Sequence, residues 1–88
     1  MDTSLPATPT RVAVLILKYL EQQPNAKDTA FGIAEWWVHQ PLDLVEQALA
    51  VLTALGFISS VTAGGSEKVF EAQQDKREEM TAWRKRFE

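Results

Sequence analysis

Few side chains of this 88-residue chain are of the types that carry out catalysis. His39 is the single histidine, and the chain contains no cysteine that could act as a nucleophile or a zinc ligand. Gly64 and Gly65 have the position of a hairpin tip, not of a phosphate-binding turn between a strand and a helix. No nucleophile–base set is apparent, and we expect His39 to lie in a turn. The sequence therefore predicts no enzyme, no bound metal and no cofactor.

The charged side chains point to binding instead. Basic residues gather near the two ends of the chain, where they could contact DNA phosphates; the candidates are Arg11, Lys18, Lys68, Arg77, Arg84, Lys85 and Arg86. Between Asp28 and Glu67 the chain has no lysine or arginine at all. The formal net charge is −3, and an acidic body does not attract a polyanion by itself.

The composition of the chain indicates what kind of fold holds these residues. With 45% hydrophobic and 24% charged side chains, the chain predicts one small globular domain, and its three tryptophans supply large apolar surfaces for the core. The apolar run from Val12 to Leu17 is too short to span a bilayer and has no basic leader region before it. Together with the lack of cysteine, this leads us to expect a cytoplasmic protein with no membrane partner.

The first helix has a clear start and stop. Residues 1–8 are polar and without periodicity, and we expect them to form a flexible tail. Thr8 and Pro9 are typical of a helix start, and Pro24 ends the helix. Its core-facing stripe is predicted to be Val12, Leu15, Ile16, Tyr19 and Leu20.

A second helix is expected from Asp28 or Thr29 to Val38. Residues 25–29 could hold a very short strand, although no alternation of polar and apolar residues supports it. The inward face of the helix is predicted to be Ala30, Ile33, Ala34 and Trp37. The adjacent Trp36 is expected either to fold over the terminal helix or the hairpin, or to remain exposed as an interface anchor.

The stretch from residue 41 to residue 72 carries the strongest pattern. A third helix is expected from Pro41 to Leu55, followed by Gly56 as a left-handed cap. The runs 57–62 and 67–72 predict two strands joined by the loop 63–66. A last helix over residues 73–87 has an apolar stripe of Met80, Trp83 and Phe87, in line with Lys76.

This order of elements resembles the winged helix-turn-helix superfamily over residues 9–72. The residues that carry the resemblance are Val45, Leu49, Leu52, Gly56 and Ile58, with Ile33 and Ala34 in the second helix. The resemblance implies an α+β fold with a three-helix core, a two-stranded β-hairpin wing and an extra C-terminal helix, residues 73–88. That helix is expected either to pack on the domain or to form a homodimer with a second copy.

Winged helices that bind DNA place the third helix in the major groove, and the resemblance gives that helix an outward face here. Its members would be Asp43, Glu46, Gln47, Ala50, Val51 and Ala54. Gln47 could read an adenine edge, but the face lacks the cations that usually hold phosphates. Asp43 and Glu46 have a simpler role as well, because carboxylates in the first turn of a helix interact favourably with its dipole.

We therefore expect a non-enzymatic winged-helix module, accessory to transcription or to a larger assembly, that binds a protein partner. Its contact surface would be the outward face of the third helix together with Trp36. The small apolar side chains Ala50, Val51 and Ala54 are either tolerated surface residues or part of a flat surface that a partner covers. The alternative is a dimeric regulator that binds double-stranded DNA through the basic residues named above.

Overall fold

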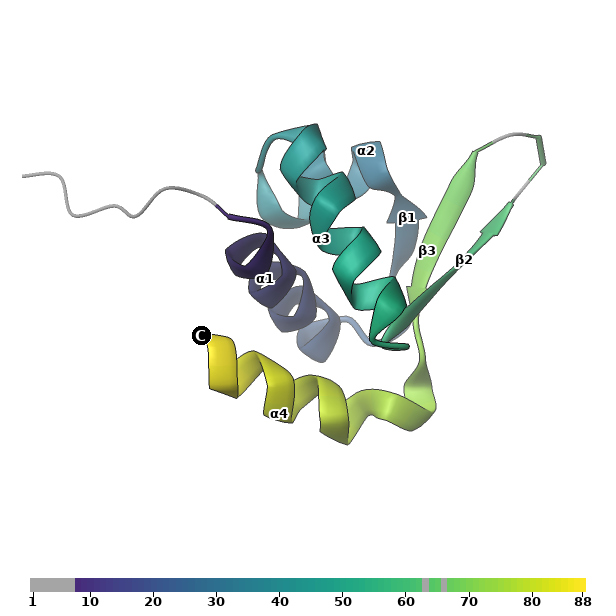
Figure 1. Ribbon diagram of the computed structural model, residues 1–88. Coiled ribbons are helices and arrows are strands. Elements are labelled where there is room, and N and C mark those ends of the chain that lie inside the picture. The colour runs from purple at the N-terminus through teal and green to yellow at the C-terminus, as the bar shows by residue number, and fades with distance from the viewer. Residues whose placement is uncertain (1–7, 63, 66) are drawn as a thin grey trace, which may run out of the picture.

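Helices and a small antiparallel sheet make up the fold of this protein, which we describe from a computed structural model covering residues 8–62, 64–65 and 67–88 (Figure 1). The predicted tail 1–7 and the loop residues Ala63 and Ser66 lie outside the described residues. Within them, the elements in chain order are α1 (Pro9–Gln22), β1 (Lys27–Thr29), α2 (Ala30–Gly32), η1 (Ile33–Val38), α3 (Leu42–Ala54), β2 (Ile58–Thr62), β3 (Lys68–Ala72), η2 (Gln74–Lys76) and α4 (Arg77–Phe87). The predicted α+β class is confirmed.

Helix α1 begins as its sequence predicts. The Thr8 hydroxyl accepts a hydrogen bond from the Arg11 backbone N–H at 3.2 Å, and proline occupies the first turn. The expected core stripe is wrong at one position, because Leu15 is 37% exposed whereas Leu17 is buried. The buried arc is shifted because α1 packs against both α3 and α4, and Leu17 lies beside Met80 of α4.

The sheet contains one strand more than the predicted two-stranded hairpin. Its order is β1-β3-β2, and all neighbours are antiparallel. In the short strand β1, Asp28 pairs with Phe70 and Thr29 with Val69. This strand forms because the backbone of β3 offers it hydrogen-bond partners, which local alternation in three residues cannot reveal.

The segment predicted as one continuous second helix has two parts. One α-helical turn, α2, is followed by the π-helix η1, which ends at His39 in the left-handed conformation (φ 54°). His39 therefore lies in a turn, as expected. Trp37 is half-buried and stacks on Tyr19 with ring centroids 4.5 Å apart. Trp36 is 73% exposed, so the expectation that it folds over the terminal helix or the hairpin is wrong.

Helix α3 lies where the spacing of apolar residues predicts it. Val45, Leu49 and Leu52 are buried against the rest of the core, and the chain leaves the helix through Gly56 at φ 80°. The Phe57 backbone N–H then donates to the Leu52 carbonyl at 3.0 Å, which closes the end of the helix. This turn directs β2 out of the body, and β2 and β3 form the hairpin at the right of Figure 1.

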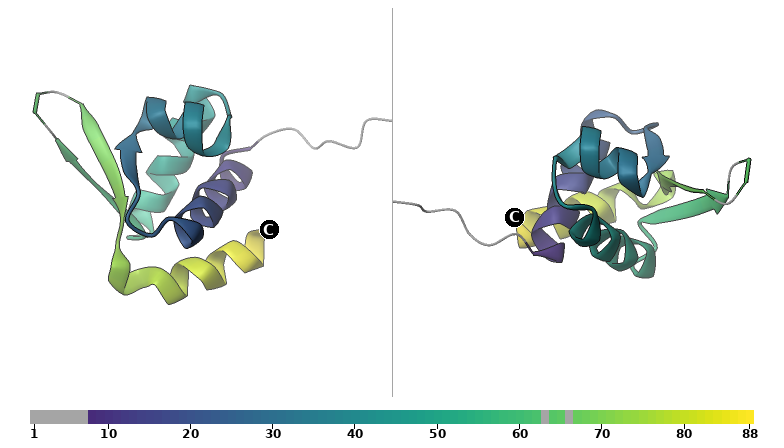
Figure 2. Two further views of the ribbon diagram at one scale, coloured as in Figure 1. Left: turned by 180° about the vertical axis from the view of Figure 1, so that it is seen from behind. Right: turned by 90° about the horizontal axis from the view of Figure 1, so that it is seen from above.

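Helix α4 packs along α1 of the same chain, as the views in Figures 1 and 2 agree. Met80 is buried, and the Trp83 ring meets the Phe57 ring edge-on at 6.4 Å. The apolar stripe of α4 is thus used largely within the chain, while Phe87 is 45% exposed. Among the described residues no helix is both long enough and apolar enough to cross a membrane.

Candidate functional site

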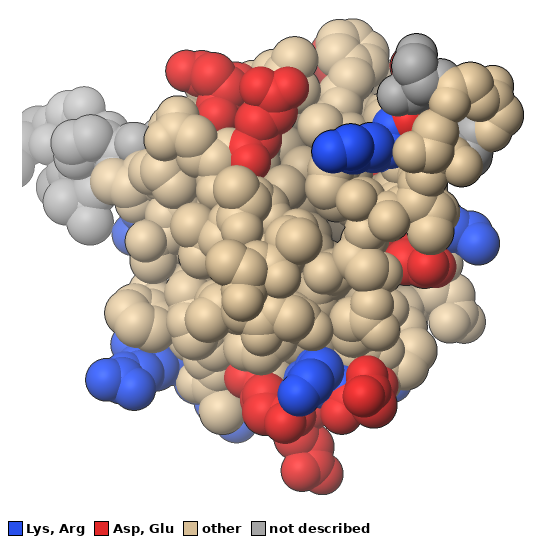
Figure 3. All heavy atoms as spheres, turned by 45° about the vertical axis from the view of Figure 1, so that its right-hand side comes forward, with Lys and Arg blue, Asp and Glu red and all other residues tan. Residues whose placement is uncertain are grey.

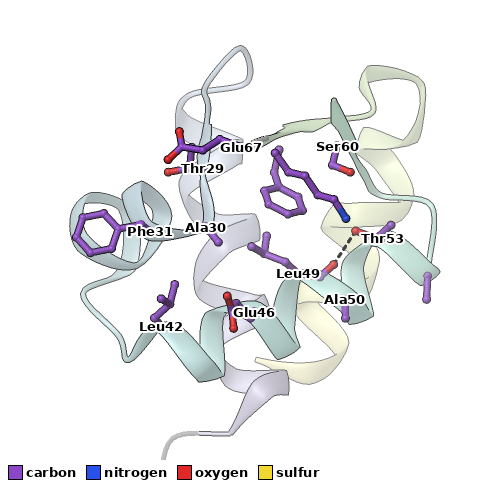
Figure 4. Close-up of a pocket in the computed structure, with 13 residues that line it drawn as sticks. Thr29, Ala30, Phe31, Leu42, Glu46, Leu49, Ala50, Thr53, Ser60 and Glu67 are labelled. Atoms are coloured by element: carbon purple, nitrogen blue, oxygen red, sulfur yellow. Dashed lines mark hydrogen bonds between the residues drawn. The ribbon is translucent and has the colours of Figure 1, made fainter. Parts of the chain in front are cut away.

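An open groove of about 720 Å³ lies between α3, the start of α2 and one face of the sheet (Figure 4). The residues that line it are Thr29, Ala30, Phe31, Leu42, Glu46, Leu49, Ala50, Thr53, Ala54, Ser60, Glu67, Lys68 and Phe70. A groove of this size is within the range of sites that bind other molecules.

Strand register sets the sheet wall of the groove. Ser60 of β2 lies directly opposite Phe70 of β3, and residues two apart on a strand share a face, so Lys68 belongs to the same wall. Strand β3 is the central strand and pairs on both sides. At Phe70, where β3 pairs with both neighbours, the sheet therefore presents a side chain to the groove and no open backbone edge, and the outer strands β1 and β2 contribute Thr29 and Ser60.

Helical spacing sets the opposite wall. Leu42, Glu46, Ala50 and Ala54 follow each other at intervals of four residues along α3, and residues at this interval lie on one side of a helix. Leu49 is buried at the floor of the groove, pointing toward the sheet in Figure 4. The Thr53 hydroxyl donates to the Leu49 carbonyl at 2.7 Å, so this polar group is satisfied within the helix (Figure 4).

The rim of the groove exposes large apolar side chains. Phe31 is 63% exposed and Leu42 is 40% exposed, both at the end of the groove where α2 and α3 begin. Isolated exposed apolar residues are ordinary on protein surfaces, but here they line a shared concavity with Ala50 and Phe70. Burial of this surface by a partner would be favourable.

Charge surrounds the groove and is scarce in its middle. The charged residues that line it are Glu46, Glu67 and Lys68. Figure 3, which brings α3 and the hairpin forward, shows a broad uncharged centre with acidic groups at its upper left, a basic side chain at its upper right and mixed charges below it. The arrangement favours contact with an apolar surface over contact with a row of phosphates.

The residues predicted for the outward face of α3 are all exposed, and the structure separates them into two sets. Glu46, Ala50 and Ala54 line the groove. The other exposed positions of the helix, which do not line it, are Asp43, Gln47 and Val51. Trp36, on η1, also lies outside the groove lining. Binding of a partner by any of these residues remains a prediction.

The predicted phosphate contacts are scattered over the molecule. Lys68 alone of them lines the groove. Arg11, Arg77, Lys85 and Arg86 are exposed on α1 and α4, and the Arg86 guanidinium lies 5.6 Å from the centroid of the Phe87 ring. The basic end of α4 lies beside α1. It is the end of α4 that is farther from the hairpin (Figures 1 and 2).

Two of the predicted phosphate contacts form ion pairs within the chain. Arg84 donates from Nε and Nη2 to the two carboxylate oxygens of Glu21, the latter at 3.1 Å. It also bonds Glu88, which in turn pairs with Lys18 at 2.6 Å. The bond to Glu21 raises the pKa of Arg84 above its usual value. Lys18 and Arg84 thus join α4 to α1 in this structure.

Sequence reasoning missed several of the groove residues. Leu42 and Ala50 belong to the same four-residue row as Glu46, so Leu42 could have been included from helical spacing alone. Phe70 and Ser60 could not have been included from the sequence. Their contribution depends on the register of the hairpin with β1 and on the position of the hairpin beside α3. The place of Phe31 depends on where α2 begins after the short strand β1, which the sequence allowed at residues 25–29 without supporting it by alternation.

A second, smaller hollow of about 330 Å³ lies between α1 and η1, where Tyr19 and Trp37 form part of its wall. Across the described ranges, no group of three or more histidine, aspartate or glutamate side chains is arranged to hold a metal ion. Comparison with known proteins gives no match to any family model, curated protein or solved structure.

Proposed function

We propose that this chain is a non-catalytic winged-helix module that binds another protein through the groove between α3 and the hairpin. The assignment to winged helices rests on the resemblance and is supported by the element order. Helix α2 continues into η1, a short turn joins η1 to α3, and α3 leads directly into a hairpin. The extra strand β1 pairs with that hairpin and leaves this order intact.

The observation that carries the proposal is the apolar groove itself. Its α3 wall carries the small residues Ala50 and Ala54, and its rim exposes Phe31 and Leu42. Protein interfaces are centred on apolar, weakly charged surface, whereas DNA interfaces require donors to phosphates. The groove offers an apolar, weakly charged surface, and Lys68 is the one cation among its lining residues.

The alternative, a dimeric DNA-binding regulator, needs basic side chains flanking α3. Lys18 and Arg84 are engaged in ion pairs between α1 and α4, and the Arg84–Arg86 segment lies at the far end of α4 from the hairpin. This distribution favours a protein partner. A role as an accessory to transcription or to a larger assembly is the wider context that we propose for such a partner.

Site-specific photo-crosslinking tests the proposal. A benzophenone amino acid at the exposed position Ala50 should form covalent adducts with a partner protein in cells that express the chain naturally. The same probe at Ala82, exposed on α4, is the matched control. We expect a protein adduct from position 50 that position 82 does not give, and loss of binding of that purified partner to an Ala54→Arg variant.

The proposal fails if position 50 gives no adduct beyond those of position 82. It also fails if the captured protein binds the Ala54→Arg variant as well as it binds the unaltered chain. The circular dichroism spectrum and unfolding midpoint of the variant serve as controls for folding, because a substitution at an exposed helical position is expected to change stability by no more than about 0.5 kcal/mol.

A further inference from the structure

The groove also indicates what kind of structure the partner presents. Building on the proposed function, we infer that the groove binds an amphipathic α-helix of about twelve residues that carries lysine or arginine on the side facing α3. Three features of the groove lead to this inference: the pairing of its central strand on both sides, the length of its helical wall, and the sign of the charge on that wall.

The central strand of the sheet wall has no free backbone edge at Phe70 with which an extended peptide in the groove could pair. Strand β3 is bonded to β1 on one side and to β2 on the other, and the groove meets the sheet through side chains such as Phe70 and Ser60. An extended peptide lying there would leave its backbone N–H and C=O groups without partners on an apolar surface. A helix satisfies these groups internally, so it can enter such a groove at little polar cost.

The length of the α3 wall matches a short helix. From Leu42 to Ala54 the wall extends roughly 18 Å at the usual rise of a helix, which corresponds to about twelve residues of a second helix laid along it. Ala50 and Ala54 have small side chains, so a helix backbone can approach α3 closely at that end. Phe31 and Leu42 stand at the other end, where they can pack against larger apolar residues.

The charge of the groove predicts the sign of the charge on the partner helix. Glu46 lies on the α3 wall, and Glu67 lies on the hairpin side. Asp43 is exposed one turn before Glu46 on the same helix. Lys68 at the hairpin is the one cation in the lining. A partner helix with a basic residue near Glu46 would gain attraction there, and one with an acidic residue would be repelled.

Selection from two peptide display libraries tests the inference with the full chain immobilised. One library holds 14-residue helical peptides with apolar residues at i, i+3, i+4 and i+7, and with lysine, glutamate or serine at the flanking positions. The other holds peptides of equal length and composition with strict apolar–polar alternation. We expect enrichment from the helical library, with lysine preferred over glutamate beside the apolar stripe.

Variants of the chain identify the site. The Ala50→Arg variant should lose the selected helical peptides, because the larger side chain fills the groove. The Glu46→Lys variant should bind the lysine peptides about fivefold to tenfold more weakly and should invert the selection in favour of glutamate. Glu79→Lys on α4, which is exposed outside the groove, is the matched control and should change neither result.

The outcomes separate failure of the inference from failure of the proposed function. Enrichment of alternating peptides that Ala50→Arg abolishes would overturn the helical partner and leave a protein-binding groove in place. Helical peptides with no preference between lysine and glutamate would overturn the predicted charge. Peptides that bind Ala50→Arg unchanged, or no enrichment from either library, would overturn the groove as the site of a helical partner, whereas the photo-crosslinking experiment separately decides whether any protein is bound.

Discussion

Trp36 and Trp37 are adjacent in sequence and of the same type, and they lie in different environments. Trp37 stacks on Tyr19 with an angle of 12° between the rings and packs against the buried core. Trp36, the preceding residue of η1, is 73% exposed. Aromatic stacking and area burial should therefore contribute to stability at position 37 and not at position 36.

Alanine substitution at the two positions should separate these environments. We expect Trp37→Ala to lower the free energy of unfolding by about 2–3 kcal/mol, somewhat less than for a fully buried tryptophan. Trp36→Ala should change it by no more than about 0.5 kcal/mol. Urea unfolding followed by circular dichroism measures both values. Equal losses in the two variants would contradict the positions that the structure gives these rings.

At the scale of the elements, the docking of α4 on α1 combines apolar packing with a small ion-pair network. Met80 and Trp83 supply the packing, while Arg84 and Lys18 bridge to Glu21 and Glu88. The hydrogen bond from Lys18 lowers the pKa of Glu88 below the usual carboxyl value of 4.5, and the nearby positive charges of Lys18 and Arg84 act in the same direction. This part of the docking should depend on pH.

The sign of the pH dependence follows from the lowered pKa of Glu88. Its contribution to stability is complete above the unfolded-state pKa and is lost as the pH falls through the lower pKa of the folded state. We expect the Trp83 indole resonance to show α4 loosening as the pH falls below about 4.5. In Glu88→Gln that pH dependence should be weaker, while Glu79→Gln should behave as the unaltered chain. An unchanged acid transition in Glu88→Gln would show that this pair does not contribute.

At the scale of the whole molecule, charge is distributed so that the basic end of α4 lies away from the groove face. The chain carries a formal charge of −3, and the groove lining contains two carboxylates and one lysine. Lys18 and Arg84, which could have flanked α3, are used to join α4 to α1. Attraction of a polyanion to the α3 face is therefore weak.

Titration with a labelled duplex of mixed sequence tests this distribution. We expect no binding at micromolar protein concentration, measured by fluorescence anisotropy at low salt. A double variant, Asp43→Lys with Glu46→Lys, reverses the sign of the α3 face and should gain binding that weakens as salt rises. Micromolar binding by the unaltered chain with a steep salt dependence would instead support the DNA-binding alternative.

The sequence by itself determined the elements whose signals are local. The start of α1 at Thr8 and Pro9, the span of α3 and its end at Gly56 depend on capping and on helical spacing over a few turns, and the structure agrees with them. The exposure of Asp43, Glu46, Gln47, Ala50, Val51 and Ala54 was predictable for the same reason. Such features involve residues close together in the chain, so one sequence contains the necessary information.

Tertiary structure decided the features that depend on distant partners. Strand β1 exists because β3 pairs with it, and Leu15 is exposed because the buried arc of α1 is shaped by two neighbouring helices. The groove joins α3 to Phe70 and Ser60 through hairpin register and packing. Hydrogen bonding and apolar burial between distant segments are properties of their arrangement in space, which local residue patterns do not encode.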